Sequence, residues 1–462
     1  MLLQSPPQNA YLATRGAGQP ARAVPGALFL VVVFLLFAVS SGMLGRLGIN
    51  HGGVTGAMAS KIHPATYMAF FTVALLVVCY RTPVSFFANL VTRQPGTLAF
   101  LIAILMLAAY IALDERKGIA TIFDTYLLAV AVALIAAEVS SRDFARVEML
   151  IHVVLAANAA LALIEYAIGY RFFPFRFEGV ELEWDMRSTG LSGHPLENAQ
   201  LTGVYILALL GGGGSRMPRA LRPAAILLQL AAMVPFGGRT ATLLTLALMA
   251  LWLVPRIVRF FTGGRVSLVA LACVSILVPV LALAAAALVT GGFFDLLLDR
   301  FADDSGSANT RVAMFEIFGQ LSARDILIGA NPEIIDSIRR SMGLELGIEN
   351  PVVRLVLYQG TIFTGFLIAG FTLFLIEIAH RLRSGYAMSL IFFLLVVNSY
   401  ESISNKTIGL AQFIVLLMAM FHQPISARSA FGLASGRGVA LARETERNGA
   451  NYRGNLYGRF GV

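Results

Sequence analysis

Long apolar runs recur from one end of the chain to the other, and short polar segments separate them. A helix needs about 20 mainly apolar residues to cross the hydrocarbon core of a bilayer, so we expect about twelve membrane-spanning helices. The predicted spans are 25–44, 65–81, 97–113, 119–139, 144–169, 196–211, 222–236, 240–255, 266–290, 352–378, 385–400 and 404–422. Several of these ranges are short. The pair 222–236 and 240–255 and the pair 385–400 and 404–422 are each alternatively a hairpin, so the exact number of spans stays open. The sequence therefore predicts an all-α, polytopic transmembrane protein.

The segments outside these spans divide the chain. Residues 1–24 are polar and rich in Gly, Pro and Ala, and we expect a loosely structured cytoplasmic segment there. Residues 423–462 are rich in Gly, Arg and Asn and predict a disordered, basic cytoplasmic tail. The region between them, 25–422, is the expected transmembrane catalytic domain. Its first apolar run lacks a clear small-residue cleavage site, so we expect no cleaved signal peptide.

The charges between the spans predict the orientation. If the N-terminus is cytoplasmic, the inner segments hold Arg15, Arg22, Arg81, Arg93, Arg142, Arg146, Arg216, Arg219, Arg222, Arg256, Arg259, Arg265, Arg381, Arg383 and the arginines of the tail. The opposite side then collects Glu178, Glu181, Glu183, Asp185, Asp303, Asp304, Asp325, Glu349 and Glu401. Cytoplasmic loops of membrane proteins carry an excess of Lys and Arg. We therefore expect a bacterial inner-membrane protein with both termini in the cytoplasm.

Two of the outer segments, about 170–195 and 291–351, are too long to be simple turns. The longer one is a large periplasmic loop between spans nine and ten. It contains an amphipathic stretch, 309–321, with Val312, Phe315, Phe318 and Leu321 at helical spacing. We expect this stretch to be a helix at the outer membrane surface. Long ordered loops are usually functional, so the outer face is where we expect the activity.

Composition narrows the class of protein further. Hydrophobic residues make up 57% of the chain and charged residues only 13%, about half the share typical of soluble domains. The net charge of +9 does not indicate nucleic acid binding, because the arginines are clustered between spans as topology signals. Cys79 and Cys273 lie inside apolar runs and are expected to be buried. We expect no metal site and no cofactor, since no His/Cys cluster or phosphate-binding Gly-x-x-x-x-Gly-Lys loop occurs in the sequence.

Arginines also occur on the predicted outer side, where topology does not require them. Arg187, Arg239, Arg311 and Arg354 stand near the ends of spans or open the amphipathic stretch, several of them beside Gly, Ser, Thr or Pro. Arginine at a lipid–water boundary can simply snorkel and pair with acids. As a set they also suit a phosphate or diphosphate, because guanidinium is permanently charged and donates in a bidentate way.

Two outer residues are candidate bases. Glu349 lies at the end of the long loop, directly before span ten, and His194 precedes Pro195 at the start of span six. Either could take a proton from a sugar hydroxyl. The structural alternatives are an acid favoured by a helix N-terminus for Glu349 and a loop hydrogen-bonding role for His194. Within the spans, Asp124 is the one candidate for the deep carboxylate that a proton-coupled transporter needs.

These residues stand in an order that resembles the O-antigen polymerase and ligase superfamily, which includes the Wzy-type polysaccharide polymerases. The likeness covers roughly 25–422 and rests on the topology and on four short patterns. The patterns are Arg187-Ser-Thr-Gly-Leu-Ser-Gly-His-Pro-Leu-Glu-Asn198, Gly238-Arg239-Thr240, Asn309-Thr-Arg311 with Leu327-Ile-Gly-Ala330, and Glu349-Asn350 with Tyr358-Gln-Gly360. The ligases typically carry His-Asn where this chain has Glu349-Asn350, so the polymerases are the nearer likeness.

The resemblance implies a metal-independent, inverting glycosyltransferase that polymerises undecaprenyl-diphosphate-linked repeat units into surface polysaccharide or exopolysaccharide at the periplasmic face. Arg239 and Arg311 are then the expected diphosphate contacts, Arg187 and Arg354 support them, and Glu349 or His194 is the base. The implied partners are the lipid-linked glycan, an acceptor glycan, the lipid bilayer, and chain-length regulators or export proteins. An O-antigen ligase that transfers glycan to lipid A-core, and a flippase or exporter of the same glycan, are the alternatives.

Overall fold

The computed structural model describes residues 23–53, 56–79, 83–114, 118–177, 179–183, 185–262, 283, 286–295, 298–299, 307–344, 347–399 and 403–422. It is 76% helical, with almost no sheet. Among the described residues the sheet is one antiparallel pair, β1 (Arg176–Phe177) with β2 (Val180–Glu181). The all-α fold class is therefore confirmed.

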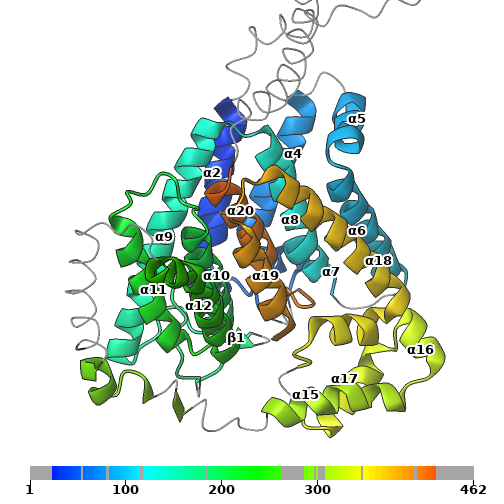
Figure 1. Cartoon of the computed structure of the whole chain (residues 1–462). Coiled ribbons are helices and arrows are strands. Elements are labelled where there is room, and N and C mark those ends of the chain that lie inside the picture. Colours follow the sequence, from blue (N-terminus) through cyan, green and yellow to red (C-terminus); the bar gives the residue numbers. More distant parts are fainter. Residues whose placement is uncertain are drawn as a thin grey trace, which may run out of the picture. The chain divides into compact units, whose positions relative to one another are not determined.

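The helices follow the apolar runs of the sequence (Figure 1). They are α2 (Ala23–Ala38), α3 (Ser41–Arg46), η2 (Met58–Lys61), α4 (Pro64–Cys79), α5 (Pro83–Arg93), α6 (Pro95–Leu113), α7 (Ile119–Thr121), η3 (Ile122–Leu127), α8 (Leu128–Glu138), α9 (Ser141–Ile168), α10 (Pro195–Leu210), α11 (Leu221–Phe236), α12 (Arg239–Phe261), α15 (Ser307–Glu316), η4 (Ile317–Gln320), α16 (Ala323–Ile328), α17 (Pro332–Ser341), α18 (Pro351–Arg381), α19 (Ala387–Val396), η5 (Val397–Ser399) and α20 (Gly409–Met420).

Five of these elements are long and apolar enough to cross a membrane: Pro95–Leu113, Ile119–Glu138, Ser141–Ile168, Arg239–Val258 and Pro351–Arg381. A sixth span results if α4 and α5, which meet at 108°, are counted as one broken span. Shorter apolar helices occupy 26–38, 221–236, 387–399 and 409–420. Every predicted range that the structure describes holds a helix, while 266–290 lies largely outside the described residues. The full count of twelve spans stays a prediction.

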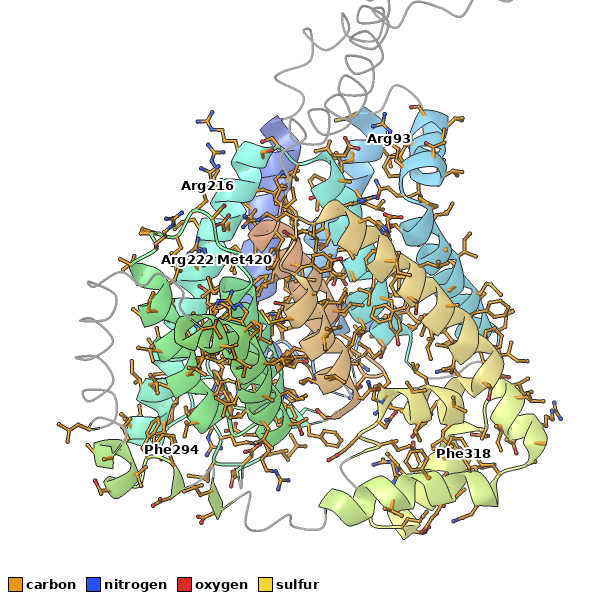
Figure 2. The ribbon with its side chains drawn as sticks, in the orientation of Figure 1. Arg93, Arg216, Arg222, Phe294, Phe318 and Met420 are labelled. Atoms are coloured by element: carbon orange, nitrogen blue, oxygen red, sulfur yellow. The ribbon has the colours of Figure 1, made fainter. Side chains whose placement is uncertain are left out.

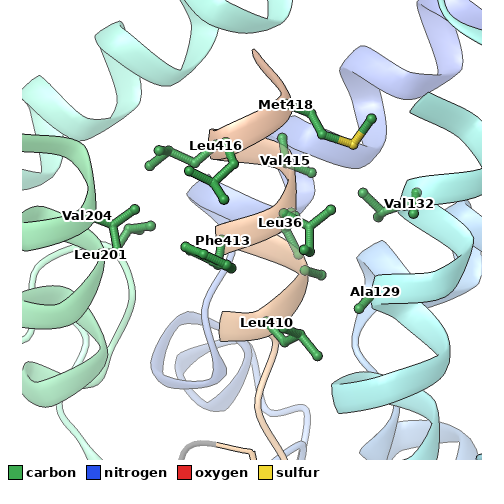
Figure 3. Close-up of a cluster of buried hydrophobic side chains, with 14 of the residues drawn as sticks. Leu36, Ala129, Val132, Leu201, Val204, Leu410, Phe413, Val415, Leu416 and Met418 are labelled. Carbon is green, nitrogen blue, oxygen red and sulfur yellow. The ribbon is translucent and has the colours of Figure 1, made fainter. Parts of the chain in front are cut away.

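Helix α20 lies at the centre of the main core, and every side chain from Leu410 to Met420 is buried. Figure 3 shows its residues in contact with side chains of α2, α8 and α10, among them Leu36, Val132 and Leu201. The ring of Phe413 stacks on Phe393 of α19, with centroids 3.7 Å apart. Close packing of this kind holds helices together in lipid, where burial of apolar surface provides little driving force.

A second, smaller core lies around α15, η4 and α17. It consists of Met314, Ile317, Ala330, Ile335, Leu344, Ile348, Val353 and Leu357. The last two belong to the start of α18, which has non-helical backbone angles at Gly360 (φ 80°, ψ 161°). A Cβ at Gly360 would lie 2.4 Å from the Leu327 carbonyl oxygen, so only glycine allows α16 to approach here.

The structure adds detail to one sequence-based expectation and corrects another. The helix in 309–321 is present, but Met314 and Ile317 are the residues that face the small core, whereas Val312 and Phe315 are exposed. Phe318 and Leu321 are partly buried against the same core, and the location of the helix at the membrane surface stays a prediction. Cys79 was expected to be buried and is exposed, because it is the last residue of α4. Cys273 lies outside the described residues.

Candidate functional site

Four segments that are distant in sequence meet at one end of the helix bundle: 39–63, 118–125, 188–197 and 403–408. We call this the network end. Helices α4, α10 and α20 begin there. The basic side chains Arg93, Arg216 and Arg222 lie at the opposite end, which is the upper end in Figure 2. These three arginines are among those expected on the cytoplasmic side.

Asp124 is the centre of the network end and is fully buried. Its Oδ1 accepts hydrogen bonds from the Thr66 hydroxyl (2.7 Å) and from the backbone N–H of His63 (3.0 Å). Its Oδ2 lies 3.3 Å from Nε2 of His51. Both oxygens act as acceptors, which is the bonding pattern of an ionised carboxylate. A buried carboxylate needs such partners, because an unpaired charge in the interior is very costly.

An uncommon turn of backbone carries this side chain. Residues Ile122–Leu127 form a π-helix, η3, between α7 and α8. π-Helical turns are rare and are frequently found at functional sites. Within this turn, three consecutive polar side chains, Asp124, Thr125 and Tyr126, are all buried. Residues Leu128–Ala136 of the following α8 are buried as well, so η3 belongs to an enclosed stretch of the chain.

His51 extends the network beyond Asp124. Its Nδ1 lies 3.1 Å from the Ser41 hydroxyl oxygen, and its backbone carbonyl accepts a hydrogen bond from the ammonium of Lys406. Because Oδ2 of Asp124 accepts, Nε2 carries the proton and Nδ1 is the acceptor for the Ser41 hydroxyl. Burial lowers the pKa of His51; the bond to Asp124 opposes this effect and the charge of Lys406 adds to it.

The other ionisable groups of this cluster have shifted pKa values too. The ring of His63 meets that of His51 edge to face, with centroids 5.4 Å apart. Burial, and then the neighbouring His51, lower the pKa of His63 to about 4. Burial also lowers the pKa of Lys406 to about 8, although Asp124 opposes this. Shifts of this kind concentrate at functional sites, although structural networks show them as well.

The loop that carries Lys406 is fastened on both sides. Thr125 donates from its hydroxyl to the Asn405 carbonyl (2.8 Å) and accepts from the Thr407 N–H (3.0 Å). The Thr407 hydroxyl donates to Glu197 at the start of α10 (2.5 Å). These bonds fix the backbone around Lys406 to η3 and α10, so its ammonium is held at the His51 carbonyl.

The segment 185–194, which contains two of the predicted site residues, packs beside this network. Arg187 forms a bidentate pair with Asp185, with Nε–Oδ1 and Nη2–Oδ2 distances of 2.7 and 2.5 Å. His194 caps α10, because its Nδ1 accepts from the N–H groups of Leu196 (3.2 Å) and Glu197 (3.4 Å). Burial, and then the charge of Arg187, lower the pKa of His194 to about 3.

Gly193 joins this segment to the turn that begins α3, next to Ser41. It has a positive φ of 70°, and a Cβ there would lie 3.0 Å from both the Gly42 nitrogen and the Ser40 hydroxyl. The two turns therefore touch through glycines at positions where a larger side chain would push them apart. As a result, Ser41 and His194 belong to one continuous surface.

Arg239 is the first residue of α12 and stands on the turn next to the Arg187 segment. The Ser188 N–H donates to the Pro235 carbonyl (2.9 Å). A Cβ at Gly238 would lie 2.6 Å from the Cβ of Ala199 in α10. The structure thus brings together three of the predicted residues, Arg187, His194 and Arg239, on adjacent turns at the network end.

The remaining predicted residues belong to the start of α18 and the small core. Glu349 is half-buried and precedes Asn350, whose side chain caps α18 by accepting from Val352 N–H (2.9 Å) and Val353 N–H (3.1 Å). Arg354 lies over the ring of Tyr358 (5.5 Å) and within electrostatic reach of Tyr126 in η3. The backbone of Arg311 lies in α15, and its side chain lies outside the described residues.

An apolar cavity begins next to Arg354. Leu355, Tyr126, Phe371 and Leu410 line it together with other apolar residues of α6, α18 and the 403 loop. It lies between α6, α18 and the residues that flank the start of α20. The lining is apolar apart from the Tyr126 hydroxyl, which donates to the Ile403 carbonyl, so the cavity suits an apolar group.

Sequence reasoning missed His51 and His63 and gave Asp124 only a possible transport role. One signal was present: the chain has six histidines, and two of them fall in the single segment between the first two predicted spans. Polar, ionisable residues beside spans are functional candidates by default. Among the described residues, no group of three or more His, Cys, Asp and Glu side chains is arranged to hold a metal ion.

Comparison of the chain with models of known protein families gives no match, and comparison with curated proteins gives none either. The resemblance to the polymerase and ligase superfamily therefore rests on the residues and their order.

Proposed function

We propose that this protein is a membrane glycosyltransferase that joins polyprenyl-diphosphate-linked oligosaccharide units into a polysaccharide at the periplasmic face of the bacterial inner membrane. The observation that carries the proposal is the convergence of Arg187, His194 and Arg239 on turns bonded to one another at the network end. These residues come from two of the four sequence patterns, separated by more than forty positions in the chain. The adjacency of their turns supports a shared role in binding an anion.

Each part of the site has a function in this reaction. Arg239 is the principal diphosphate contact, as the family resemblance implies, and Arg187, which pairs with Asp185, supports it. Arg354 supports the diphosphate contact, and the cavity lined by Leu355 suits an apolar group of the substrate. An acceptor hydroxyl attacks the anomeric carbon in line, which inverts that centre. The guanidinium groups stabilise the negative charge that develops on the departing diphosphate.

The arrangement of charges supports the proposed topology. Arg93, Arg216 and Arg222 lie at the end of the bundle opposite to the network end (Figure 2), which suits the cytoplasmic side. With about twelve spans, both termini and these arginines would be cytoplasmic, and 170–195 and 291–351 would be the periplasmic loops.

A deletion strain, read out on a gel of surface glycans, tests this function. Single repeat units on the carrier or the acceptor indicate a polymerase. Long, unattached polymer would indicate a ligase instead, and loss of all periplasmic glycan would indicate a flippase. Normal glycan in the deletion strain would contradict all three.

Complementation with arginine variants tests the site itself. Arg239→Ala should reduce chain growth about 100-fold or more, because a charge-assisted contact to the leaving group is lost. Arg216→Ala is the matched control: Arg216 is exposed at the opposite end of the bundle and should support normal polymer length. Membrane levels of both proteins should be equal by immunoblot. Normal polymer in Arg239→Ala would exclude the diphosphate role.

A further inference from the structure

We propose that His51 is the proton acceptor of this glycosyltransferase, that the Ser41 hydroxyl relays the proton from the acceptor sugar to it, and that Asp124 positions the imidazole. This inference rests on the proposed function. It replaces Glu349 and His194 as the base with a chain of three side chains drawn from three different segments.

The geometry is that of a nucleophile or relay hydroxyl, a base and an orienting acid. Ser41 Oγ lies 3.1 Å from His51 Nδ1, and His51 Nε2 lies 3.3 Å from Asp124 Oδ2. A base within hydrogen-bond reach of a hydroxyl, itself oriented by a third group, is the arrangement that activates a hydroxyl. Asp124 is held in turn by the Thr66 hydroxyl and the His63 N–H.

The protonation states also suit a base. Asp124 accepts from His51 Nε2–H, which leaves the lone pair of Nδ1 facing the Ser41 hydroxyl. Burial keeps the imidazole neutral and able to accept a proton, since it lowers the pKa of His51. When the imidazole becomes charged during the reaction, the carboxylate of Asp124 stabilises it.

The two bases suggested by the sequence fit less well. The Nδ1 lone pair of His194 is already used, because it accepts from two backbone N–H groups at the start of α10. Glu349 adjoins the cap of α18, on the segment that completes the small core. Ser41, by contrast, is half-buried and lies in the turn that touches Gly193, beside the Arg187 segment.

The proposed step balances without a co-reactant. The acceptor sugar hydroxyl gives its proton to Ser41 Oγ, and the Ser41 hydroxyl proton passes to His51 Nδ1. The freed acceptor oxygen forms a bond to the anomeric carbon. The bond between that carbon and the diphosphate oxygen breaks, and its electron pair leaves with the diphosphate.

Two neighbouring serines offer a matched test. The substrate is the lipid-linked oligosaccharide extracted from the deletion strain, and the enzyme is the full chain in lipid nanodiscs. Ser41→Ala should lower kcat about 100-fold with KM little changed. Ser40→Ala should keep kcat near that of the wild type, because Ser40 donates no contact to His51 and instead caps α3 through Met43 N–H (3.2 Å). Equal kcat values for the two variants would overturn the relay.

The pH profile separates a base from a structural group. The titratable and polar groups that face His51 are His63, Asp124, Lys406 and Ser41. The charge of Lys61 lowers the pKa of Lys406. Asp124 raises the pKa of His51 and Lys406 lowers it. Asp124→Asn should therefore move the acid limb of kcat/KM to lower pH, and Lys406→Met should move it to higher pH, each by about one pH unit.

The outcomes distinguish the relay from the function on which it rests. If Arg239→Ala stops chain growth while Lys406→Met leaves the acid limb unmoved, the relay is wrong and the glycosyltransferase stands. If the deletion strain makes normal glycan, both are wrong. If Asp124→Asn fails to reach the membrane, Lys406→Met and Ser41→Ala still decide the relay.

Discussion

Asp124 and Glu165 are both buried carboxylates, and the difference between them lies in their partners. Glu165, in the last turn of α9, accepts from the N–H groups of Phe172 (3.0 Å), Thr189 (2.8 Å) and Gly190 (2.8 Å). All three partners are backbone amides, which exchange no protons during a reaction. Asp124 accepts from one amide, one hydroxyl and the imidazole of His51. Burial alone therefore does not separate a structural acid from a functional one, whereas the chemistry of the partners does.

The comparison explains why these two acids have different consequences for the molecule. Glu165 fastens the segment 172–190 to the end of α9, and so it sets where Arg187 lies. Asp124 fastens the turn at His63 as well, but it also fixes the orientation of a titratable ring. We therefore expect changes at Glu165 to act on stability and changes around Asp124 to act on pH dependence too.

The largest effect should follow from Glu165→Ala. This change leaves three buried amides without an acceptor, which should cost at least about 3 kcal/mol in the free energy of unfolding. Thermal denaturation of the purified protein measures this loss, and limited proteolysis should show new cleavage within 172–190. Glu165→Gln keeps one carbonyl acceptor and should lose less. Wild-type stability in Glu165→Ala would contradict the structural role assigned to Glu165.

The next largest effect is a loss of stability at acid pH, which we expect from His63, a neighbour of Asp124. His63 has a pKa of about 4 in the folded protein and 6.5 as its ordinary value. Between these values the unfolded chain binds more protons, so stability should fall as pH falls from 6.5 towards 4. The slope for this one buried group is at most about 1.4 kcal/mol per pH unit.

Thermal unfolding at a series of pH values measures that slope. His63→Asn is the control, because an amide oxygen can still accept from the Ala65 N–H, as His63 Nδ1 does (3.2 Å). The variant should show a flatter dependence of stability on pH in the same window. An unchanged slope would mean that His63 does not carry the acid sensitivity.

A smaller effect should follow from Thr66→Val, which removes the hydroxyl that donates to Asp124 and keeps the shape of the side chain. A hydrogen bond to a charged group contributes about 2 kcal/mol, so the free energy of unfolding should drop by that amount. Thr72→Val, on the same helix, removes only a bond to the Met68 carbonyl (2.7 Å) and should cost less. Equal losses in the two variants would show that the hydrogen bond from Thr66 to Asp124 stabilises the fold no more than a bond to a neutral carbonyl does.

The smallest effect is expected for Ser40→Ala, which removes the cap of α3 and should cost about 1 kcal/mol. Its stability should fall slightly, and the acid limb of its pH profile should stay where it is in the wild type. A shifted acid limb would place Ser40 inside the proton relay. Ser40 would then belong with the functional contacts around Asp124 and not with structural contacts such as those of Glu165.

The sequence predicted the helices well and the site only in part, for a physical reason. Apolar runs long enough for a bilayer mark helices such as α6, α9 and α18 without any knowledge of their neighbours. His194 and Glu349 were recognised because they stand at helix starts, which is local information. The contact of His51 with Asp124 joins residues 73 positions apart, and that of Lys406 with His51 joins residues 355 apart. Hydrophobic patterning does not indicate which loops meet, so these contacts required the fold.

Gly360 divides α18 between two cores. The residues before it complete the small core with Val353 and Leu357, and Arg354 stands among them. Those after it pack on α6, as Phe374 does on Phe100 with ring centroids 5.2 Å apart. A chimaera made by exchanging 307–359 between relatives would therefore transplant an arginine together with the scaffold that orients it. Under the proposed function, Gly360 is a junction at which part of the substrate-binding surface can be exchanged, provided that Leu355, which packs in the main core, is kept.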